Sequence, residues 1–301
     1  MLDFKEIDIY DKPLFDKYLL EYKPRASEMN FTNFFMWRNF YKFKFIEISN
    51  LLCIISVPDN GEPFAFIPIG MHTPEGFRGT VFRIMDYFFE NGWRPVFKRV
   101  EEEKVQLFKE YLNFACEVVF DRDSSDYVYL TEELINLKGK KFDGKRNHIN
   151  KFKKLYEYEY IRMSNEHIDE CIRINEEWCA QRSCDTHKEL YCEKIANNEL
   201  LKNFSKLGCK GALIKVNGRI EGYTIGEVLN NDTAVIHIEK ASSDIRGLYT
   251  IINQQFCENE WRDMTYINRE QDLGIEGLRK AKLSYNPVRM TNKYSVYMHY
   301  A

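Results

Sequence analysis

The sequence lacks any long apolar run, and no stretch approaches the roughly 18 apolar residues of a membrane-spanning helix. Acidic residues interrupt Met1–Asp8, so the start also lacks the apolar core of a signal peptide. Net charge is small, with 43 Lys and Arg against 46 Asp and Glu. This balance argues against a dedicated nucleic-acid-binding protein. We therefore expect a cytoplasmic protein without a membrane span.

The eight cysteines do not form the spacing of a disulfide framework. Several lie inside apolar patterns, which predicts reduced, buried thiols. Metal-ligand residue types do cluster at Cys179, Cys184, His187 and Cys192. Their C-x4-C-x2-H-x4-C spacing, however, matches no common zinc motif. We expect no bound metal and no covalently attached cofactor.

The 301 residues are enough for two domains of about 150 residues each. Hydrophobic residues make up 44% of the chain, and 22 Phe and 19 Tyr can supply an aromatic core. Strand-like and helix-like segments alternate in both halves. We expect an α/β (α+β) fold with domains at 1–137 and 161–301, joined by a basic helix at 138–160.

The first half is expected to begin irregularly. Residues 1–42 are rich in aromatics, which we assign to core packing, and Pro13 is a candidate start for a short helix. After this region, the predicted strands are 43–48, 51–57, 64–69, 95–100, 116–120 and 126–130, and the predicted helices are 81–91 and 101–112.

A strongly basic segment connects the halves. Between Lys138 and Lys154, eight Lys or Arg residues accompany one Asp, and apolar residues recur at helical spacing. This amphipathic basic helix is either a solvated linker or a surface that binds the phosphates of tRNA or of an acidic cofactor. Binding to a membrane surface is a third interpretation.

The second half has a clearer pattern. Asn217-Gly218 is a favoured two-residue turn and predicts a hairpin of 211–216 with 219–229. In the next strand, 233–240, an apolar face is opposed by His237 and Glu239, as expected of a strand that lines a site or is half-exposed. The other predicted elements are helices at 166–181, 187–206 and 249–260 and strands at 265–267 and 288–300.

The final helix, expected after Gly274, carries a cation on its apolar face. Ile275, Leu278 and Lys282 share one face at helical spacing, and Arg279 lies on its flank. A lysine on a docking face is costly unless it reaches water or an opposite charge. Lys282 is therefore either an ordinary lysine at the edge of the core or part of a functional site.

The residues 268–274 (Asn-Arg-Glu-Gln-Asp-Leu-Gly) and 277–285 (Gly-Leu-Arg-Lys-Ala-Lys-Leu-Ser-Tyr) resemble the closing signature of a bacterial protein family. This family is poorly characterised and is grouped with the C-terminal domain of phosphatidylglycerol lysyltransferase. The segments 27–38, 139–152 and 237–241 resemble it too. The resemblance implies two acetyltransferase-like (GNAT) domains in tandem, each a mixed sheet flanked by helices.

The resemblance also implies acyl transfer of the aminoacyl-tRNA type. Lys282 matches the family's lysine and is assigned to the tetrahedral oxyanion, while Arg279 is expected to hold phosphate or carboxylate. Asp272 or Glu239 is expected to orient or deprotonate the acceptor amine. The other implied positions are Arg269, His237, Asn268 and Tyr285 for substrate, Arg246, Gly247, Arg146 and Lys145 for phosphate, and Asn147 beside Arg146.

Two departures from known patterns leave the substrates open. Ser284 replaces the second lysine of the lysyltransferase pattern, so the acceptor can be a small molecule or a lipid head group. Only Arg246-Gly247 is present where acetyl-CoA enzymes carry a longer glycine-rich pattern. The alternatives are an acyl-CoA-dependent N-acetyltransferase and a non-catalytic module that binds a ligand or RNA.

Overall fold

A computed structural model describes residues 2–112, 116–184 and 188–299. The chain forms two compact units, neither of which is contiguous in sequence. Unit 1 comprises Met1–Asp126, Gln271–Ile275 and Met290–Ala301; unit 2 comprises Tyr127–Glu270 and Glu276–Arg289. The domain boundaries expected from the sequence stay a prediction, because compactness does not show which segment folds alone.

Unit 1 contains a mixed sheet with the strand order β1-β2-β3-β4-β5-β12-β6. β4 is parallel to β5, and β5 pairs antiparallel with β12. The strands are β1 (Lys5–Glu6), β2 (Phe43–Ile48), β3 (Leu51–Ser56), β4 (Phe64–Ala65), β5 (Val96–Glu101), β6 (Cys116–Leu130) and β12 (Arg289–Met298). The strands expected at 116–120 and 126–130 are thus one strand, which continues through polar residues.

The helices of unit 1 are α1 (Lys12–Tyr22), α2 (Phe31–Tyr41), α3 (Pro74–Glu90) and α4 (Glu102–Leu112). The expectation of irregular structure up to residue 42 was wrong for α2. The side chain of Asn30 caps this helix by accepting a hydrogen bond from the Asn33 amide at 2.8 Å. Phe31, Phe34 and Phe35 then share a buried face at helical spacing, so tertiary packing favours the helix.

A buried ion cluster fixes the last strand in unit 1. Lys293 of β12 is fully buried and lies 2.6 Å from Asp126 and 2.5 Å from Glu28. Ser27 donates its hydroxyl to Asp126 at 2.8 Å. The two neighbouring carboxylates raise the pKa of Lys293 against the effect of burial. These contacts connect the N-terminal Ser27-Glu28 segment to β6 and β12.

The strands of unit 2 follow β6 in the same 12-stranded sheet, in the order β6-β11-β10-β9-β8-β7, with parallel and antiparallel pairs. The strands after β6 are β7 (Tyr158–Arg162), β8 (Lys210–Val216), β9 (Arg219–Val228), β10 (Thr233–Ala241) and β11 (Tyr266–Asn268). The Asn217-Gly218 hairpin is confirmed, and both turn residues have positive φ. β6 pairs antiparallel with β11 through Val128–Leu130. The last residues of this strand therefore belong to unit 2.

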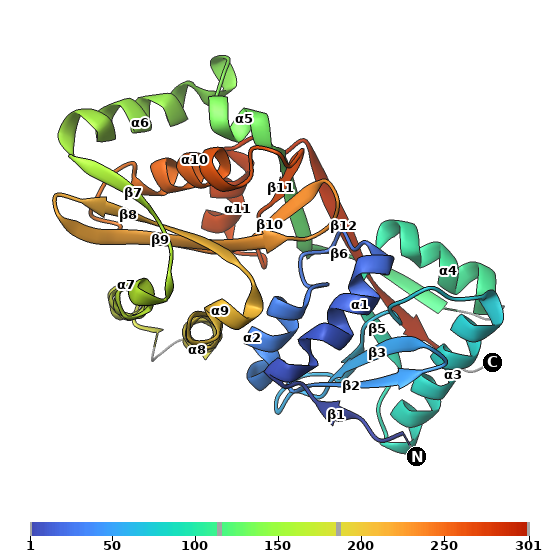
Figure 1. Ribbon diagram of the computed structural model, residues 1–301. Coiled ribbons are helices and arrows are strands. Elements are labelled where there is room, and N and C mark those ends of the chain that lie inside the picture. The colour runs from blue at the N-terminus through green and yellow to red at the C-terminus, as the bar shows by residue number, and fades with distance from the viewer. Residues whose placement is uncertain (1, 113–115, 185–187, 300–301) are drawn as a thin grey trace. The chain divides into compact units, whose positions relative to one another are not determined.

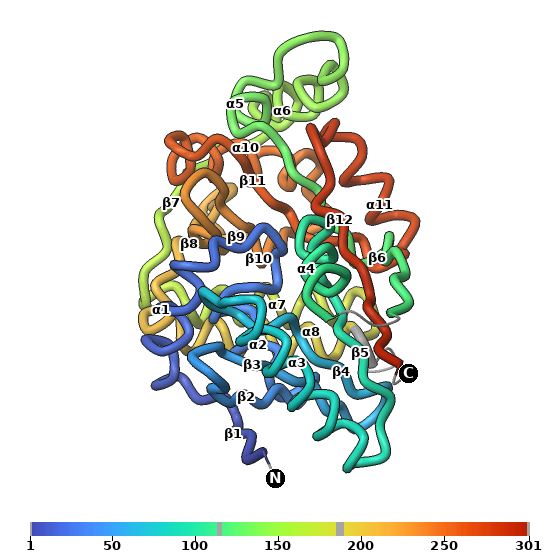
Figure 2. Tube along the Cα trace, turned by 90° about the vertical axis from the view of Figure 1, so that its right-hand side faces the viewer, coloured from blue at the N-terminus to red at the C-terminus, as the bar shows by residue number. Residues whose placement is uncertain are grey.

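Helices cover both faces of the unit 2 sheet (Figure 1). α10 packs on β8, β9 and β10, and α7 packs on β9 and β10. Figure 2 shows α5 and α6 beside α10 from a second direction. The helices are α5 (Thr131–Asn136), α6 (Asp143–Leu155), α7 (Ile168–Gln181), α8 (Lys188–Lys202), α9 (Phe204–Leu207), α10 (Leu248–Glu260) and α11 (Glu276–Leu283).

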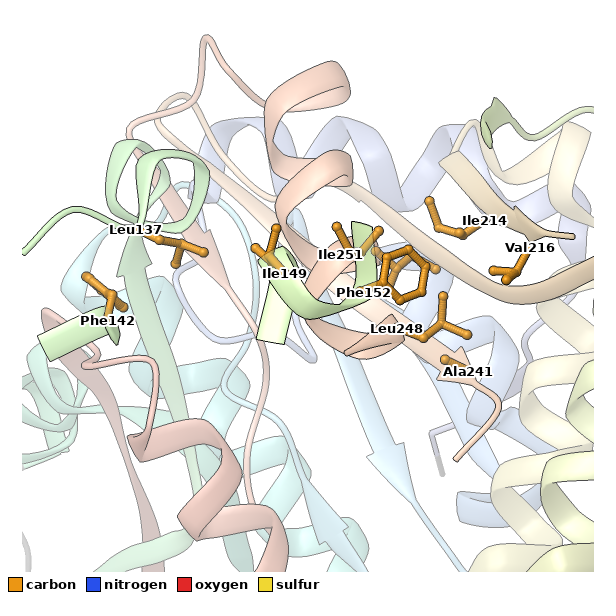
Figure 3. Packing of buried hydrophobic residues seen from close by; sticks show 10 residues of the cluster. Leu137, Phe142, Ile149, Phe152, Ile214, Val216, Ala241, Leu248 and Ile251 are labelled. Atoms are coloured by element: carbon orange, nitrogen blue, oxygen red, sulfur yellow. The ribbon is translucent and has the colours of Figure 1, made fainter. Parts of the chain in front are cut away.

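The expected basic helix is α6, and its apolar face is docked. Ile149 and Phe152 are buried against Leu248 and Ile251 of α10 and Ile214 of β8 (Figure 3). Burial of two large apolar side chains is worth roughly 1.5–3 kcal/mol for each one. The helix is therefore a fixed part of unit 2, and its basic residues occupy a defined surface.

The expectation that all cysteines are reduced was wrong for one pair. Cys179 near the end of α7 and Cys184 form a disulfide, because the turn brings their Cα atoms to 5.1 Å. Their sulfurs are therefore bonded to each other, and His187 of the same sequence cluster lies outside the described residues. Within the described ranges, no group of three or more His, Cys, Asp or Glu side chains is arranged to hold a metal.

Candidate functional site

The candidate site begins where the parallel pairing of β10 and β11 ends. The paired residues are Thr233 with Tyr266, Ala234 with Ile267, and Val235 with Asn268. β11 stops at Asn268, whereas β10 continues to Ala241. Side chains from the rest of β10 and from the loop after β11 can therefore meet beyond the last paired residues.

Arg269 and Glu239 form an ion pair at this position. Arg269 Nη2 lies 3.0 Å from Glu239 Oε1, and their side chains are only 14% and 13% exposed. Asn253 of α10 donates its amide to Glu239 Oε2 at 3.2 Å. Burial disfavours the guanidinium, but the charge of Glu239 outweighs it and raises the pKa of Arg269. The site therefore contains a fixed guanidinium with a carboxylate partner.

Two tyrosine rings enclose the guanidinium. Arg269 Cζ lies 4.7 Å from the ring centroid of Tyr285 and 5.8 Å from that of Tyr129. The rings meet edge to face, with their centroids 6.4 Å apart. Burial raises the pKa of both phenols, so they stay neutral near pH 7. Stacking on aromatic faces suits a planar guanidinium.

Lys145 of α6 adds a second cation. Its Nζ lies 3.6 Å from the ring centroid of Tyr285 and donates a hydrogen bond to Ser284 Oγ at 2.7 Å. Burial and then the charge of Arg269 lower the pKa of Lys145 to about 8, although Glu239 acts in the opposite direction. The sequence had suggested only phosphate binding for this residue.

His237 lies between two carboxylates. Its Nε2 is 2.9 Å from Glu227 Oε1 on β9, and its Nδ1 is 3.0 Å from Glu270 Oε1. The imidazole is fully buried, which disfavours its charge. The hydrogen bonds to the two carboxylates outweigh that effect and raise the pKa of His237 to about 9. His237 is therefore protonated at neutral pH and ties β9 to the loop that carries Arg269.

The backbone around Arg269 is held from several directions. Asn268 Oδ1 accepts a hydrogen bond from the Glu270 amide at 2.8 Å, and the Arg269 amide donates to Tyr127 O at 2.9 Å. The amine of Lys282 donates to the main-chain oxygen of Arg269. Lys282 is thus brought to the same cluster, where it holds the Arg269 peptide. Its role at the oxyanion stays a prediction.

The other predicted acid, Asp272, belongs to unit 1. Its buried carboxylate lies 3.2 Å from Arg122 Nη1 and accepts a hydrogen bond from the Gly274 amide at 2.9 Å. These contacts stabilise the turn before α11. These contacts give Asp272 a local structural role, and its assignment as an acid or base stays a prediction.

The expected docking stripe of the final helix was wrong. No residue of α11 is buried; Leu278 is 36% exposed, and Ile275 just before the helix is 49% exposed. Eight residues give the helix barely two turns. Arg279 is half-buried, and its role in holding phosphate or carboxylate stays a prediction.

Two predicted phosphate-binding positions have local structural contacts, and their binding of phosphate stays a prediction. Arg146 hydrogen-bonds to the main-chain oxygens of Leu137 and Gly139 and to Asp143, so it closes the turn before α6. Gly247 has φ +93° at the start of α10, where a Cβ would lie only 2.8 Å from the main-chain oxygen of His148. It allows α6 to approach α10 closely. Arg246 is exposed.

Sequence reasoning missed Asn253 and Tyr129 as members of the site. Asn253 is a buried amide within an otherwise apolar helical face, and such a residue requires a polar partner. A single polar residue on the apolar face of this helix could therefore have identified Asn253 as a site residue. Tyr129 gave no comparable signal, because alternating tyrosines in a strand are ordinary core residues.

A family comparison decides the relationship of the chain to known proteins. The family model described as "Phosphatidylglycerol lysyltransferase, C-terminal" matches residues 21–297. The chain belongs to this family. An uncharacterised protein of Mycoplasmoides gallisepticum is 25% identical over 181 residues. That match covers 59% of this chain and 58% of the relative, so it spans less than two thirds of the relative's length.

Solved structures show the same fold. A conserved protein of unknown function from Bacteroides thetaiotaomicron is 33% identical, with a TM-score of 0.93 over 99% of this chain and 100% of the other. L-PGS from Bacillus licheniformis is 17% identical, with a TM-score of 0.67 over 99% and 94%. A tandem GNAT protein of the clavulanic acid pathway has a TM-score of 0.53 at 9% identity over both full chains. The fold is therefore that of tandem acetyltransferase-like domains.

Family membership and fold together support an acyltransferase. None of the described helices has the length and apolar character needed to cross a membrane. The chemistry available in unit 2 is a fixed guanidinium, a carboxylate, an amide and a lysine amine around two tyrosines. This set can bind a polar acyl donor and stabilise negative charge.

Proposed function

We propose that the chain transfers an aminoacyl group from aminoacyl-tRNA to an amine or hydroxyl acceptor. The observation that carries this proposal is a pair of unpaired polar atoms on the two residues that bind Glu239. Arg269 Nη1 and Asn253 Oδ1 are buried and have no hydrogen-bond partner among the described residues. A buried donor or acceptor left unpaired costs about 1–3 kcal/mol, so a substrate group is expected to use both.

The two atoms differ in hydrogen-bonding character. Arg269 Nη1 is a donor, and Asn253 Oδ1 is an acceptor. An aminoacyl group offers a carbonyl oxygen to the first and an ammonium to the second, while the nearby Glu239 carboxylate favours the positive charge. An acetyl group offers only the carbonyl oxygen. The pair therefore favours an aminoacyl donor over an acetyl donor.

Arg269 also suits the chemistry of the transfer. The acceptor's nitrogen or oxygen attacks the ester carbon, and the carbonyl oxygen becomes a tetrahedral oxyanion. A fixed N–H donor at such an oxyanion is typically worth about 2.7–4 kcal/mol. The ion pair with Glu239 and the enclosing tyrosines keep the guanidinium in place before the reaction begins.

The exposed face of α6 supports tRNA as the carrier. Lys151, Lys153 and Lys154 are exposed on this helix, while Ile149 and Phe152 dock it to unit 2. A fixed row of lysines attracts the phosphates of a nucleic-acid backbone without reading its sequence. The close packing of α6 on Gly247 weighs against coenzyme A, whose pyrophosphate occupies this helix start in acetyl-CoA enzymes of the fold.

The test compares donors. The protein is mixed with aminoacyl-tRNA prepared from a bacterial tRNA pool, with small amines or with phosphatidylglycerol vesicles as acceptors, and loss of the ester is followed. N-acetylated aminoacyl-tRNA is the matched control, because it keeps the ester and the tRNA but lacks the ammonium. We expect acceptor-dependent loss with the free amine and little with the blocked one.

A parallel arm measures thiol release from acetyl-CoA with the same acceptors. Thiol release without ester loss would replace the proposal with acyl-CoA-dependent N-acetylation. Tight binding of tRNA with no turnover of either donor would indicate a binding module. Equal use of free and N-acetylated aminoacyl-tRNA would remove the assigned role of Asn253 Oδ1.

A further inference from the structure

Lys145 is placed to exchange a proton at this site. It reaches from α6 to the ring of Tyr285, and its amine donates to the Ser284 hydroxyl at 2.7 Å. The side chain is half-exposed, so a substrate can reach the amine. Arg269 Cζ lies 4.7 Å from the same ring centroid. One tyrosine therefore has two cationic side chains near it.

The charges around Lys145 disfavour its protonated form. In the part of the chain that the structure describes, no carboxylate forms an ion pair with it, and the acidic group nearby, Glu239, is already paired with Arg269. The other titratable neighbours are the neutral phenol of Tyr285 and His148 of the same helix, whose pKa burial and nearby cations lower. Partial burial beside Arg269 lowers the pKa of Lys145 to about 8.

We propose that Lys145 is the general base and acid of the transfer, a catalytic role that rests on the proposed function. The neutral amine takes the proton from the acceptor's nitrogen or oxygen as that atom forms its bond to the acyl carbon. The tetrahedral intermediate then breaks the ester C–O bond, and the Lys145 ammonium gives the same proton to the departing ribose oxygen. No net proton, electron or further reactant is required.

The other lysine of the cluster provides a contrast. Lys282 uses its amine to hold the main-chain oxygen of Arg269, which is a positioning contact. Lys145 donates to a hydroxyl, and a hydroxyl can either accept or donate a hydrogen bond. A neutral lysine amine keeps two N–H groups, so the Ser284 contact survives deprotonation of Lys145. The Lys282 amine is instead engaged with the backbone at Arg269.

The first test measures Lys145 directly and needs no substrate. Trace acetylation with acetic anhydride at a series of pH values, followed by peptide mass spectrometry, gives the titration of each lysine. We expect Lys145 to titrate near pH 8, well below the ordinary lysine value of about 10.4. Lys215, which pairs with Glu159 on the surface, supplies a reference peptide in the same digest. A Lys145 titration near pH 10 would overturn the acid–base role of Lys145 and would leave the proposed function standing.

The second test uses variants in the aminoacyl-transfer assay. We expect the wild-type rate to rise with pH to a plateau above about 8, and Lys145→Gln to lower it by about 10²–10⁴-fold and remove the inflection. Lys145→Arg keeps a cation but cannot deprotonate, so it should not restore the rate, whereas Lys145→Cys alkylated with bromoethylamine should. Lys215→Gln is the control.

The outcomes separate the two proposals. Full activity in Lys145→Arg would show that a fixed positive charge suffices and would overturn the acid–base role. Absence of transfer in the wild type would overturn the proposed function and this role together, whatever the labelling shows. Circular dichroism of each variant confirms that the fold is retained.

Discussion

Glu239 Oε1 lies 3.0 Å from Arg269 Nη2; Glu239 belongs to strand β10, and Arg269 directly follows its parallel neighbour β11. The carboxylate is shared with Asn253 on the helix between these strands. Three segments that are separate in sequence thus meet at one carboxylate. The proposed function depends on this contact among Glu239, Arg269 and Asn253. The same contact should also contribute to the stability of unit 2.

Removal of Glu239 should destabilise the fold strongly. Glu239→Ala leaves the Arg269 guanidinium buried without its charge partner, and breaking a buried pair typically costs about 3–5 kcal/mol. Urea unfolding of both single variants and of the double variant Glu239→Ala/Arg269→Ala measures the coupling. If the two single effects simply add, the pair contributes no interaction energy and the geometry does not describe the protein in solution.

His237 should make stability depend on pH. Its pKa is raised to about 9 in the folded state from about 6.5 in an unfolded chain. The resulting stabilisation is fully present below about pH 6.5 and is lost as the pH rises through about 9. We expect the unfolding free energy to fall by about 3 kcal/mol across this window.

The control for this effect is His237→Gln, which cannot titrate. The difference in unfolding free energy between wild type and variant should shrink from pH 6 to pH 9.5, as measured by urea denaturation. A constant difference across the range would mean that His237 has the same pKa in the folded and the unfolded protein, which would contradict the raised value.

The buried ion cluster of Lys293, Glu28 and Asp126 should contribute strongly to the unfolding free energy, because it holds β12 in unit 1. Lys293→Met removes the ammonium from between Glu28 and Asp126 and leaves their two buried carboxylates facing each other. We expect a loss of about 3–5 kcal/mol. Lys44→Met serves as the control, because Lys44 is only half-buried on β2, and it should change the unfolding free energy by well under 1 kcal/mol, in the manner of other surface positions.

Two glycines separate backbone strain from close packing. Gly247 and Gly218 have similar positive φ values, +93° and +87°, but a Cβ on Gly218 would meet nothing within 4 Å. Gly218→Ala should therefore cost only the roughly 1–2 kcal/mol of a left-handed residue. Gly247→Ala should cost about 1–3 kcal/mol more, because the methyl group overlaps the His148 carbonyl. Equal effects in thermal unfolding would mean that α6 does not pack closely on α10.

The sequence predicted elements whose signals are local. The Asn217-Gly218 hairpin follows from two residues that tolerate positive φ, and α6 follows from apolar spacing among lysines. The helix α2 was missed because its stability comes from buried aromatic contacts. The apolar stripe of the final helix was over-interpreted, because a helical pattern of eight residues does not show that a partner surface exists.

The site was predictable only in part. His237 and Glu239 were recognised from strand alternation, and Arg269 from its place in the closing signature. Their partners were not recognised, because Asn253, Glu227 and Tyr129 reach them through the pairing of strands and the packing of α10. Such contacts depend on tertiary structure and leave little trace in spacing. Lys282 was placed in the cluster, but its contact with a main-chain oxygen could not be foreseen.

The most direct test of the central claim is the single-turnover rate of aminoacyl-ester loss in wild type and in Arg269→Lys, with a saturating amine acceptor. Lysine keeps the charge but loses the second, unpaired N–H group that the guanidinium offers to the carbonyl oxygen. The account predicts that the wild type consumes the ester and that the variant is slower by about 10²–10³-fold. Equal rates in the two proteins would contradict it.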